Sequence, residues 1–171
     1  MTTALPEAPS QVADSDHLTG EHVASWLHHF HTLVSSREEW LTQLDTAIGD
    51  ADHGAIMRRG AAAVSRRLLE HRPRGVGATL HTAGTAFAST AGVAGGILFA
   101  TFLQGLAAAL IDRHTVSVLD FANAFDAGVT CVRARGRADI DDKTMVDALL
   151  PAAHTLQLAA TDDLTLRHAC A

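Results

Sequence analysis

The residues from Thr82 to Ile111 include no charged side chain, and this stretch limits the possible folds more than any other feature of the sequence. It is long enough to cross a bilayer, because about 20 apolar residues span the hydrocarbon core. However, glycines at 92, 95 and 96 interrupt it, and it contains several Thr, Ser and Gln side chains. We therefore interpret it as two helices that are apolar on all sides and buried at the centre of a bundle.

Apolar residues recur at helical spacing through most of the remaining chain. The first predicted helix carries the apolar set Val23, Trp26, Leu27, Phe30, Leu33 and Val34. An S-x-x-E capping box at Ser35 and Glu38 predicts the start of a second helix, with Trp40, Leu41 and Leu44 facing inward. A third helix is predicted from the spacing of Ile56, Met57, Val64, Leu68 and Leu69, ending near residues 71–73.

Later helices are predicted over residues 75–90 and 96–112, the two halves of the uncharged stretch. Ser117 and Asp120 suggest the cap of a sixth helix, which ends at Gly136. A seventh helix follows Asp141 and Asp142, and Pro151 should kink it. We find no strand alternation, repeat or long linker, so the sequence predicts a single all-α domain, an antiparallel helical bundle or barrel.

Composition fits one such domain. The chain has 171 residues, of which 47% are hydrophobic, so a sizeable core can be buried. Residues 1–19 are small and polar and resemble neither a signal peptide nor a folded segment, so we expect a disordered N-terminal tail ahead of the domain at 20–171. The net charge of −6 argues against nucleic acid as a partner. Two cysteines without a CxxC pair predict free thiols in a reducing, cytoplasmic compartment.

Three aspartates, Asp45, Asp50 and Asp52, are the strongest candidates for chemistry. Asp45 falls near a predicted helix end, and the other two lie in a glycine-containing loop, so their carboxylates can converge. Converging carboxylates repel one another unless a proton or a cation neutralises them, and hard oxygen ligands suit Mg²⁺ or Ca²⁺. The spacing does not fit an EF-hand, and ordinary turn and cap residues remain an alternative explanation.

Two glycine-containing segments could approach phosphate groups. His53 and Gly54 open the third predicted helix, whose first N–H groups can bind an anion. Gly92, Gly95 and Gly96 precede another helix and could serve either phosphate binding or close helix packing. No P-loop or dinucleotide-binding motif is present. The histidines at 28, 29 and 31 have no further ligand at helical spacing, and we interpret them as a solvated helix face.

The segment from Leu41 to Gly60 resembles the signature L-x-x-L-D-x-x-I-G-D-A-D-H-G-x-x-M-x-R-G of the dihydroxyacetone kinase L subunit family. A second block, residues 135–138 and 142–151, is similar to that family's R-G-K-A and G-D-K-T-M-x-D-x-x-x-P. The two blocks occur in the family's order and lie far apart in the chain. The resemblance covers about residues 20–166.

This resemblance implies a barrel of antiparallel helices that binds ADP or ATP at one end over two Mg²⁺ ions. Asp45, Asp50 and Asp52 would be the metal ligands. The residues implied around the nucleotide are His53, Gly54, Ala55, Ile56, Ala94, Gly95, Gly136 and Met145. No protein nucleophile is implied. The implied partners are a K subunit that holds dihydroxyacetone and a phosphotransferase-system subunit that carries a phosphohistidine.

Three departures from the family pattern bear on activity. Ile56 stands where the family has Asn, and Gly95 stands where it has a phosphate-facing Ser. The family's final segment, which closes over the nucleotide, has no counterpart before Ala171, so we expect a C-terminally shortened barrel. The main hypothesis, which rests on the three aspartates and the resemblance, is a phosphotransferase subunit. The alternatives are a catalytically impaired, regulatory binding module and a metal-binding bundle without nucleotide, which the second block disfavours.

Overall fold

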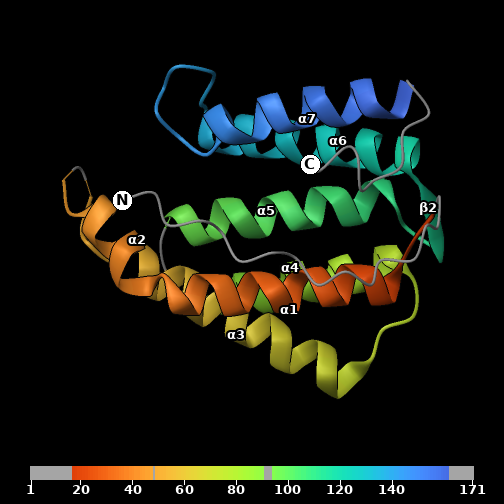
Figure 1. The fold of residues 1–171 in the computed structure, drawn as a ribbon, viewed down its shortest axis with the longest axis horizontal. Coiled ribbons are helices and arrows are strands. Elements are labelled where there is room, and N and C mark those ends of the chain that lie inside the picture. Colours follow the sequence, from red (N-terminus) through yellow and green to blue (C-terminus); the bar gives the residue numbers. More distant parts are fainter. Residues whose placement is uncertain (1–16, 48, 91–93, 162–171) are drawn as a thin grey trace, which may run out of the picture.

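The computed structural model describes residues 17–47, 49–90 and 94–161, and within them the fold is almost entirely helical (Figure 1). The helices are α1 (Gly20–Ser36), α2 (Glu38–Asp45), α3 (His53–His71), α4 (Val76–Thr90), α5 (Ala94–Ala109), α6 (Val118–Gly136) and α7 (Val146–Thr161). Neighbouring helices pack in the order α1, α3, α4, α5, α6 and α7, and α2 packs on α3. The predicted all-α class is confirmed.

A small sheet, which the sequence analysis did not predict, joins two distant parts of the chain. Strand β1 (His17–Thr19) pairs antiparallel with β2 (Thr115–Ser117), and Leu18 stands opposite Val116. Val116 is buried, while the flanking residues of β2 are at least partly exposed. Three residues are too few for an alternating pattern to stand out, so the predicted tail at residues 1–19 wrongly includes β1.

The two halves of the uncharged stretch form α4 and α5 in the centre of the bundle. Leu80 and Phe87 of α4 and Leu103 and Leu106 of α5 are all inaccessible to solvent. Small residues bring the central helices close together, since a methyl group at Gly105 would stand only 2.8 Å from Gly128 Cα of α6. In the described part of the chain, no helix combines the length and the apolarity that crossing a bilayer requires.

Helix capping was predicted correctly at α6 and incorrectly at α2. Ser117 accepts a hydrogen bond from the Asp120 N–H (3.1 Å), and Asp120 Oδ2 accepts one from the Ser117 N–H (3.3 Å). By contrast, Ser35 lies inside α1, and Arg37 forms the break before α2 without a side-chain cap. The S-x-x-E pattern failed because α1 continues to Ser36, two residues past Val34, the last residue of its apolar set.

The apolar residues of α2 also differ from the prediction. Leu41 packs against the core, but Trp40 and Leu44 are 52% and 56% exposed. Helix α2 has only 8 residues and lies mainly on α3, so a single side of it is covered. An inward-facing stripe of three apolar residues is therefore more than this short helix can bury.

Candidate metal and nucleotide site

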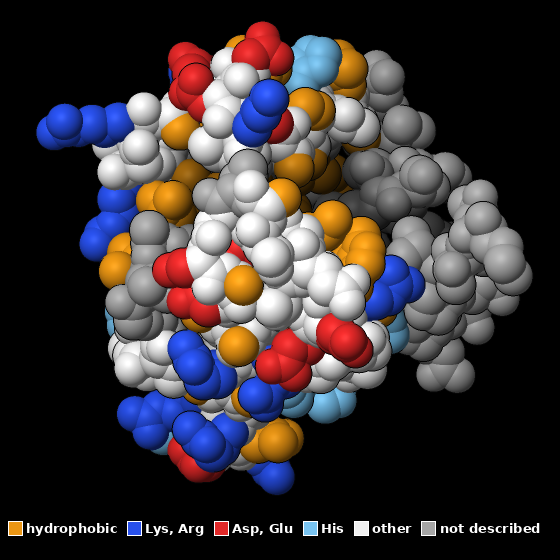
Figure 2. Space-filling model, turned by 90° about the vertical axis from the view of Figure 1, so that its left-hand side faces the viewer, with side chains coloured by type: hydrophobic (Ala, Val, Ile, Leu, Met, Phe, Trp, Pro, Cys, Tyr) orange, Lys and Arg blue, Asp and Glu red, His pale blue; other side chains and the backbone are white. Residues whose placement is uncertain are grey.

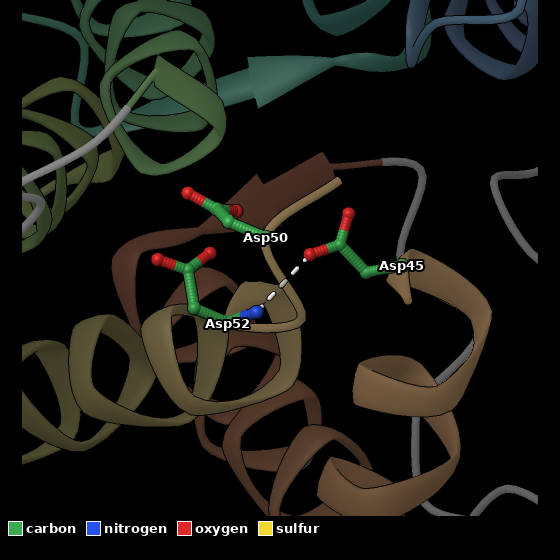
Figure 3. A group of neighbouring side chains, drawn as sticks. All are labelled: Asp45, Asp50 and Asp52. Atoms are coloured by element: carbon green, nitrogen blue, oxygen red, sulfur yellow. Dashed lines mark hydrogen bonds between the residues drawn. The ribbon is translucent and has the colours of Figure 1, made fainter. Parts of the chain in front are cut away.

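The three predicted aspartates converge between the end of α2 and the start of α3 (Figure 3). One oxygen atom from each of Asp45, Asp50 and Asp52 lies within 4.8 Å of the others. Asp50 is exposed, and Asp45 and Asp52 are partly buried. This spacing allows a single cation to contact all three carboxylates, and their hard oxygen atoms suit Mg²⁺ or Ca²⁺.

Asp45 also caps α3 across the intervening loop. Its Oδ2 atom accepts hydrogen bonds from the backbone N–H groups of Asp52 (3.1 Å) and His53 (3.3 Å), the first of which is drawn in Figure 3. A carboxylate at this position satisfies free helix donors and is favoured by the positive end of the helix dipole. The same side chain therefore fixes the start of α3 and contributes an oxygen to the cluster.

The next two N–H groups of α3 remain free. Within the described residues, Gly54 N–H and Ala55 N–H have no acceptor, whereas Ile56 N–H donates to the Asp52 carbonyl (3.0 Å). Free donors at the first turn of a helix bind phosphate or carboxylate oxygens. An anion bound to a cation on the carboxylates would thus meet two further donors on the same side of the loop.

Burial and the neighbouring carboxylates raise the pKa of Asp52 above its usual value. Partial burial is the largest influence that raises its pKa above the usual value, followed by the neighbouring carboxylates of Asp50 and Asp45. The positive charge of Arg59 opposes the rise. A cation among the three carboxylates would remove this repulsion, because it favours the charged form of each.

Two glycines near the cluster have structural roles that the sequence analysis missed. A side chain at Gly49 would come within 2.7 Å of Asp45 Cγ, so only glycine lets the loop fold over the Asp45 carboxylate. A methyl group at Gly54 would come within 2.5 Å of Thr42 Oγ1 and closer still to the Glu38 carbonyl oxygen. Gly54 therefore allows α2 to pack directly on the first turn of α3, and Glu38 extends this contact by an ion pair with Arg58 (2.7 Å).

The other candidate residues lie at the same end of the bundle, which also carries α2, the start of α5 and the loop between α6 and α7 (Figure 1). Gly136 ends α6 beside Leu98 of α5, and Met145 precedes α7 and packs against the core. Ala94 and Gly95 begin α5, and Gly92 lies outside the described residues. Ile56 is only 3% exposed, so its side chain belongs to the core and offers no polar group.

The loop that follows Gly136 is held in place by its own carboxylates. Asp147 accepts hydrogen bonds from the N–H groups of Asp141 (2.6 Å) and Thr144 (2.8 Å), and these donors lower its pKa. Asp139 accepts one from the Ile140 N–H (2.9 Å) and pairs with Arg133 (2.7 Å), which together lower its pKa. The second sequence block thus builds a defined loop over this end of the bundle.

A cavity of about 820 Å³ lies elsewhere, between the start of α1 and the loop after α3. Arg72, Arg74, Glu21 and His114 are among the residues that line it. The carboxylate cluster stands at the opposite end of α3, roughly 28 Å away for a helix of 19 residues. The cavity is therefore separate from the predicted site.

Comparison with known proteins agrees with the sequence resemblance. The DAK2 domain family matches residues 47–171. The ADP-binding subunit DhaL of the PEP-dependent dihydroxyacetone kinase of Escherichia coli is 33% identical over 149 residues, which cover 87% of this chain and 71% of that subunit. The L-erythrulose 1-kinase of Mycolicibacterium smegmatis is 31% identical over 87% of this chain, but only 26% of its own length is covered.

A solved structure shares the fold. The dihydroxyacetone kinase from C. freundii, determined in complex with AMP-PNP and Mg²⁺, superposes with a TM-score of 0.70 at 23% identity. The match covers 94% of this chain and 29% of that enzyme. The family match over most of the chain, and the similarity to a kinase subunit over most of that subunit, lead to one conclusion: this chain belongs to the DAK2 domain family of dihydroxyacetone kinase subunits and related kinases.

Proposed function

We propose that this chain is the nucleotide-binding subunit of a dihydroxyacetone kinase and holds ADP or ATP through Mg²⁺. The convergence of Asp45, Asp50 and Asp52 within 4.8 Å, beside the free N–H groups of α3, carries the proposal. The DhaL relative from Escherichia coli is named for ADP binding, and the C. freundii enzyme was solved with AMP-PNP and Mg²⁺. A nucleotide bound through Mg²⁺ is a ligand that three converging carboxylates and free helix N–H groups can hold.

Different residues would bind the metal and the phosphate groups. Asp45, Asp50 and Asp52 would hold the metal, and their six oxygen atoms are enough for two Mg²⁺ ions to share the cluster, with phosphate and water completing each shell. When bound, Mg²⁺ neutralises charge on phosphate oxygens during phosphoryl transfer. Gly54 and Ala55 would donate their free N–H groups to the phosphates, with His53 beside them.

The remaining candidates would surround the rest of the nucleotide. Ala94 and Gly95 at the start of α5 would approach the phosphates, and Gly136 and Met145 would border the pocket. Ile56 would support the first turn of α3 from the core side rather than contact the nucleotide through a polar group. All of these residues belong to the end of the bundle that carries the carboxylates (Figure 1).

The name of one relative supports the proposed partners. The Escherichia coli relative is one subunit of a PEP-dependent kinase, which fits a phosphohistidine-carrying subunit as donor and a K subunit that holds dihydroxyacetone. The bound nucleotide would carry the phosphoryl group between them. A regulatory module is the second candidate, favoured by Ile56, whose burial leaves the first turn of α3 without a polar side chain at that position.

Calorimetric titration of ADP with and without Mg²⁺ tests the proposal. We expect Mg²⁺-dependent binding by the wild-type chain and its loss in Asp50→Asn. Asp126→Asn is a matched control, because Asp126 is an exposed residue of α6 and its replacement changes the net charge equally. Absence of ADP binding by the folded wild-type chain would reject the nucleotide-binding function. Normal ADP binding without turnover, in the presence of active K and phosphohistidine-carrying subunits, would favour the regulatory module.

A further inference from the structure

Basic side chains are concentrated on α3 and the loop after it. Residues 53–74 hold six of the chain's 13 Lys and Arg residues but only one of its 19 Asp and Glu residues, Glu70. This segment has a net charge of +5, whereas the remaining residues, seven basic and eighteen acidic, have a net charge of −11. Figure 2 shows Lys and Arg side chains gathered along the lower edge of the molecule, where α3 lies in Figure 1.

Four of these arginines lie on one half of the α3 surface, which we call the basic face: Arg58, Arg59, Arg66 and Arg67. Arg59 and Arg66 are seven positions apart and therefore lie on the same side of α3, with the other two beside them. Arg58 pairs with Glu38 (2.7 Å), and Arg67 approaches Glu70 (3.7 Å). Arg59 and Arg66 are exposed and form no salt bridge with any described residue.

An exposed apolar residue accompanies the basic face. Leu69 is 72% exposed and follows Arg58 by eleven positions, which is about three helical turns, so it lies on the same side of α3. A leucine at the edge of a row of arginines offers both apolar and charged contacts, the two kinds of contact that a protein interface combines. Residues 53–71 contain no Phe, Tyr or Trp on which nucleic-acid bases could stack.

The basic face begins next to the carboxylate cluster. Arg59 lies seven residues after Asp52, the N-cap residue of α3, and is therefore about two helical turns from the carboxylate cluster. A protein bound to the basic face would therefore stand beside the site where phosphoryl transfer is proposed. Since the whole chain has a net charge of −6, an acidic partner would be repelled elsewhere and guided to this surface.

We propose that the basic face of α3 is the docking surface for an acidic face of the protein partner that exchanges a phosphoryl group at the carboxylate cluster. The inference rests on the proposed function, because it assigns a partner surface to the same site. Arg59 and Arg66 supply unpaired cations, and Leu69 supplies the apolar contact that separates protein recognition from simple attraction of polyanions.

Fluorescence anisotropy with a labelled acidic peptide tests this surface. The probe is a peptide of about 20 residues, composed of Glu with Leu at every fourth position, which as a helix is about as long as α3. We expect binding by the full chain that weakens with salt and falls about tenfold in Arg66→Glu/Arg67→Glu. Arg135→Glu/Arg137→Glu changes the net charge equally on exposed residues of another helix end and should alter binding less than about twofold.

Two comparisons separate a protein partner from other occupants. Leu69→Ser keeps the charge and should weaken peptide binding about threefold, because only the apolar contact is lost. An unchanged affinity in Leu69→Ser, tighter binding of a DNA duplex than of the peptide, or equal losses in both charge-reversal variants would overturn the proposal. Dimers of the wild-type chain that Arg66→Glu/Arg67→Glu abolishes would instead assign the surface to a second copy, and so would also overturn it.

The outcome is distinguishable from failure of the proposed function. Arg66→Glu/Arg67→Glu should bind ADP with Mg²⁺ as the wild-type chain does, because neither arginine belongs to the carboxylate cluster. If the wild-type chain binds the peptide but not ADP, the nucleotide function fails while the docking surface stands. If this variant does not fold, as judged by circular dichroism, Arg66→Gln/Arg67→Gln replaces it, with a smaller expected loss.

Discussion

Replacing Gly54 by alanine tests whether the packing of α2 on α3 sets the spacing of the carboxylates. A methyl group at this position would overlap the Glu38 carbonyl oxygen, a backbone atom of α2 that cannot rotate away, and would stand 2.5 Å from Thr42 Oγ1. An ordinary contact begins at 3.4 Å, so α2 must move by about 1 Å. Asp45 ends α2 and moves with it. Its hydrogen bond to the Asp52 N–H would lengthen from 3.1 Å to about 4 Å and break.

The expected effects differ for stability and for metal binding. Overpacking costs about 1–3 kcal/mol, and the better helix propensity of alanine returns up to about 1 kcal/mol, so the free energy of unfolding should fall by roughly 1–2 kcal/mol. Loss of the groups that orient a metal ligand lowers metal affinity about 10- to 100-fold. Urea unfolding measures the first quantity, and calorimetric titration of ADP with Mg²⁺ measures the second.

Gly60→Ala is the matched control on the same helix. Its methyl group would stand 2.5 Å from Phe87 Cε1, on a core-facing side of α3 that does not contact α2 or the carboxylates. It should therefore lower stability by a similar amount and leave the affinity for ADP and Mg²⁺ unchanged. If Gly54→Ala kept wild-type affinity, or if Gly60→Ala lost as much affinity, the packing of α2 would not control the site.

Three further predictions concern charge and the core. Asp52→Asn should make the metal-free chain more stable at neutral pH, because the raised pKa of Asp52 means that the native state disfavours the ionised carboxylate. The same substitution should abolish the rise in melting temperature with Mg²⁺. Equal melting temperatures of the two metal-free proteins would contradict the stability prediction. The ionised Asp147 carboxylate stabilises the native state above its ordinary pKa of 3.8, and this stability is lost as the pH falls through the lowered pKa. The free energy of unfolding, measured from neutral to acid pH, should therefore depend less on pH in Asp147→Asn than in wild type. Phe87→Ala removes a side chain with no solvent exposure and should cost about 3–5 kcal/mol in urea unfolding, so a loss below about 1 kcal/mol would show that this part of the core is not closely packed.

The sequence predicted the fold correctly at helix ends, where a few neighbouring residues determine the local structure. The caps of α6 and the end of α3 at His71 follow from local hydrogen bonding and helix-breaking residues, and both are confirmed. The outward direction of Trp40 could not be derived, because it depends on how much of a short helix its neighbour covers. Strand β1 was missed because its partner lies almost a hundred residues away.

The convergence of the three aspartates was predictable from the sequence, but the hydrogen bonds and close contacts that hold the loop were not. The convergence of Asp45, Asp50 and Asp52 follows from a helix end next to a glycine-containing loop, and the structure brings them together. The capping of α3 by Asp45 was not predicted, because the hydrogen bonds cross seven and eight residues rather than the usual two or three. Gly49 was within the recognised motif, but its contact with Asp45 required the three-dimensional path of the loop.

Helix α2 has no fully buried side chain, yet it ends in a residue of the carboxylate cluster. Segments with few buried contacts open at low free-energy cost, often long before the rest of the protein unfolds. When α2 lifts away from α3, it takes Asp45 with it and leaves the cluster with two carboxylates. The lifetime of a bound cation would then be set by the opening rate of this two-turn helix, so exchange of the ion and hydrogen exchange of the α2 amides should share one rate.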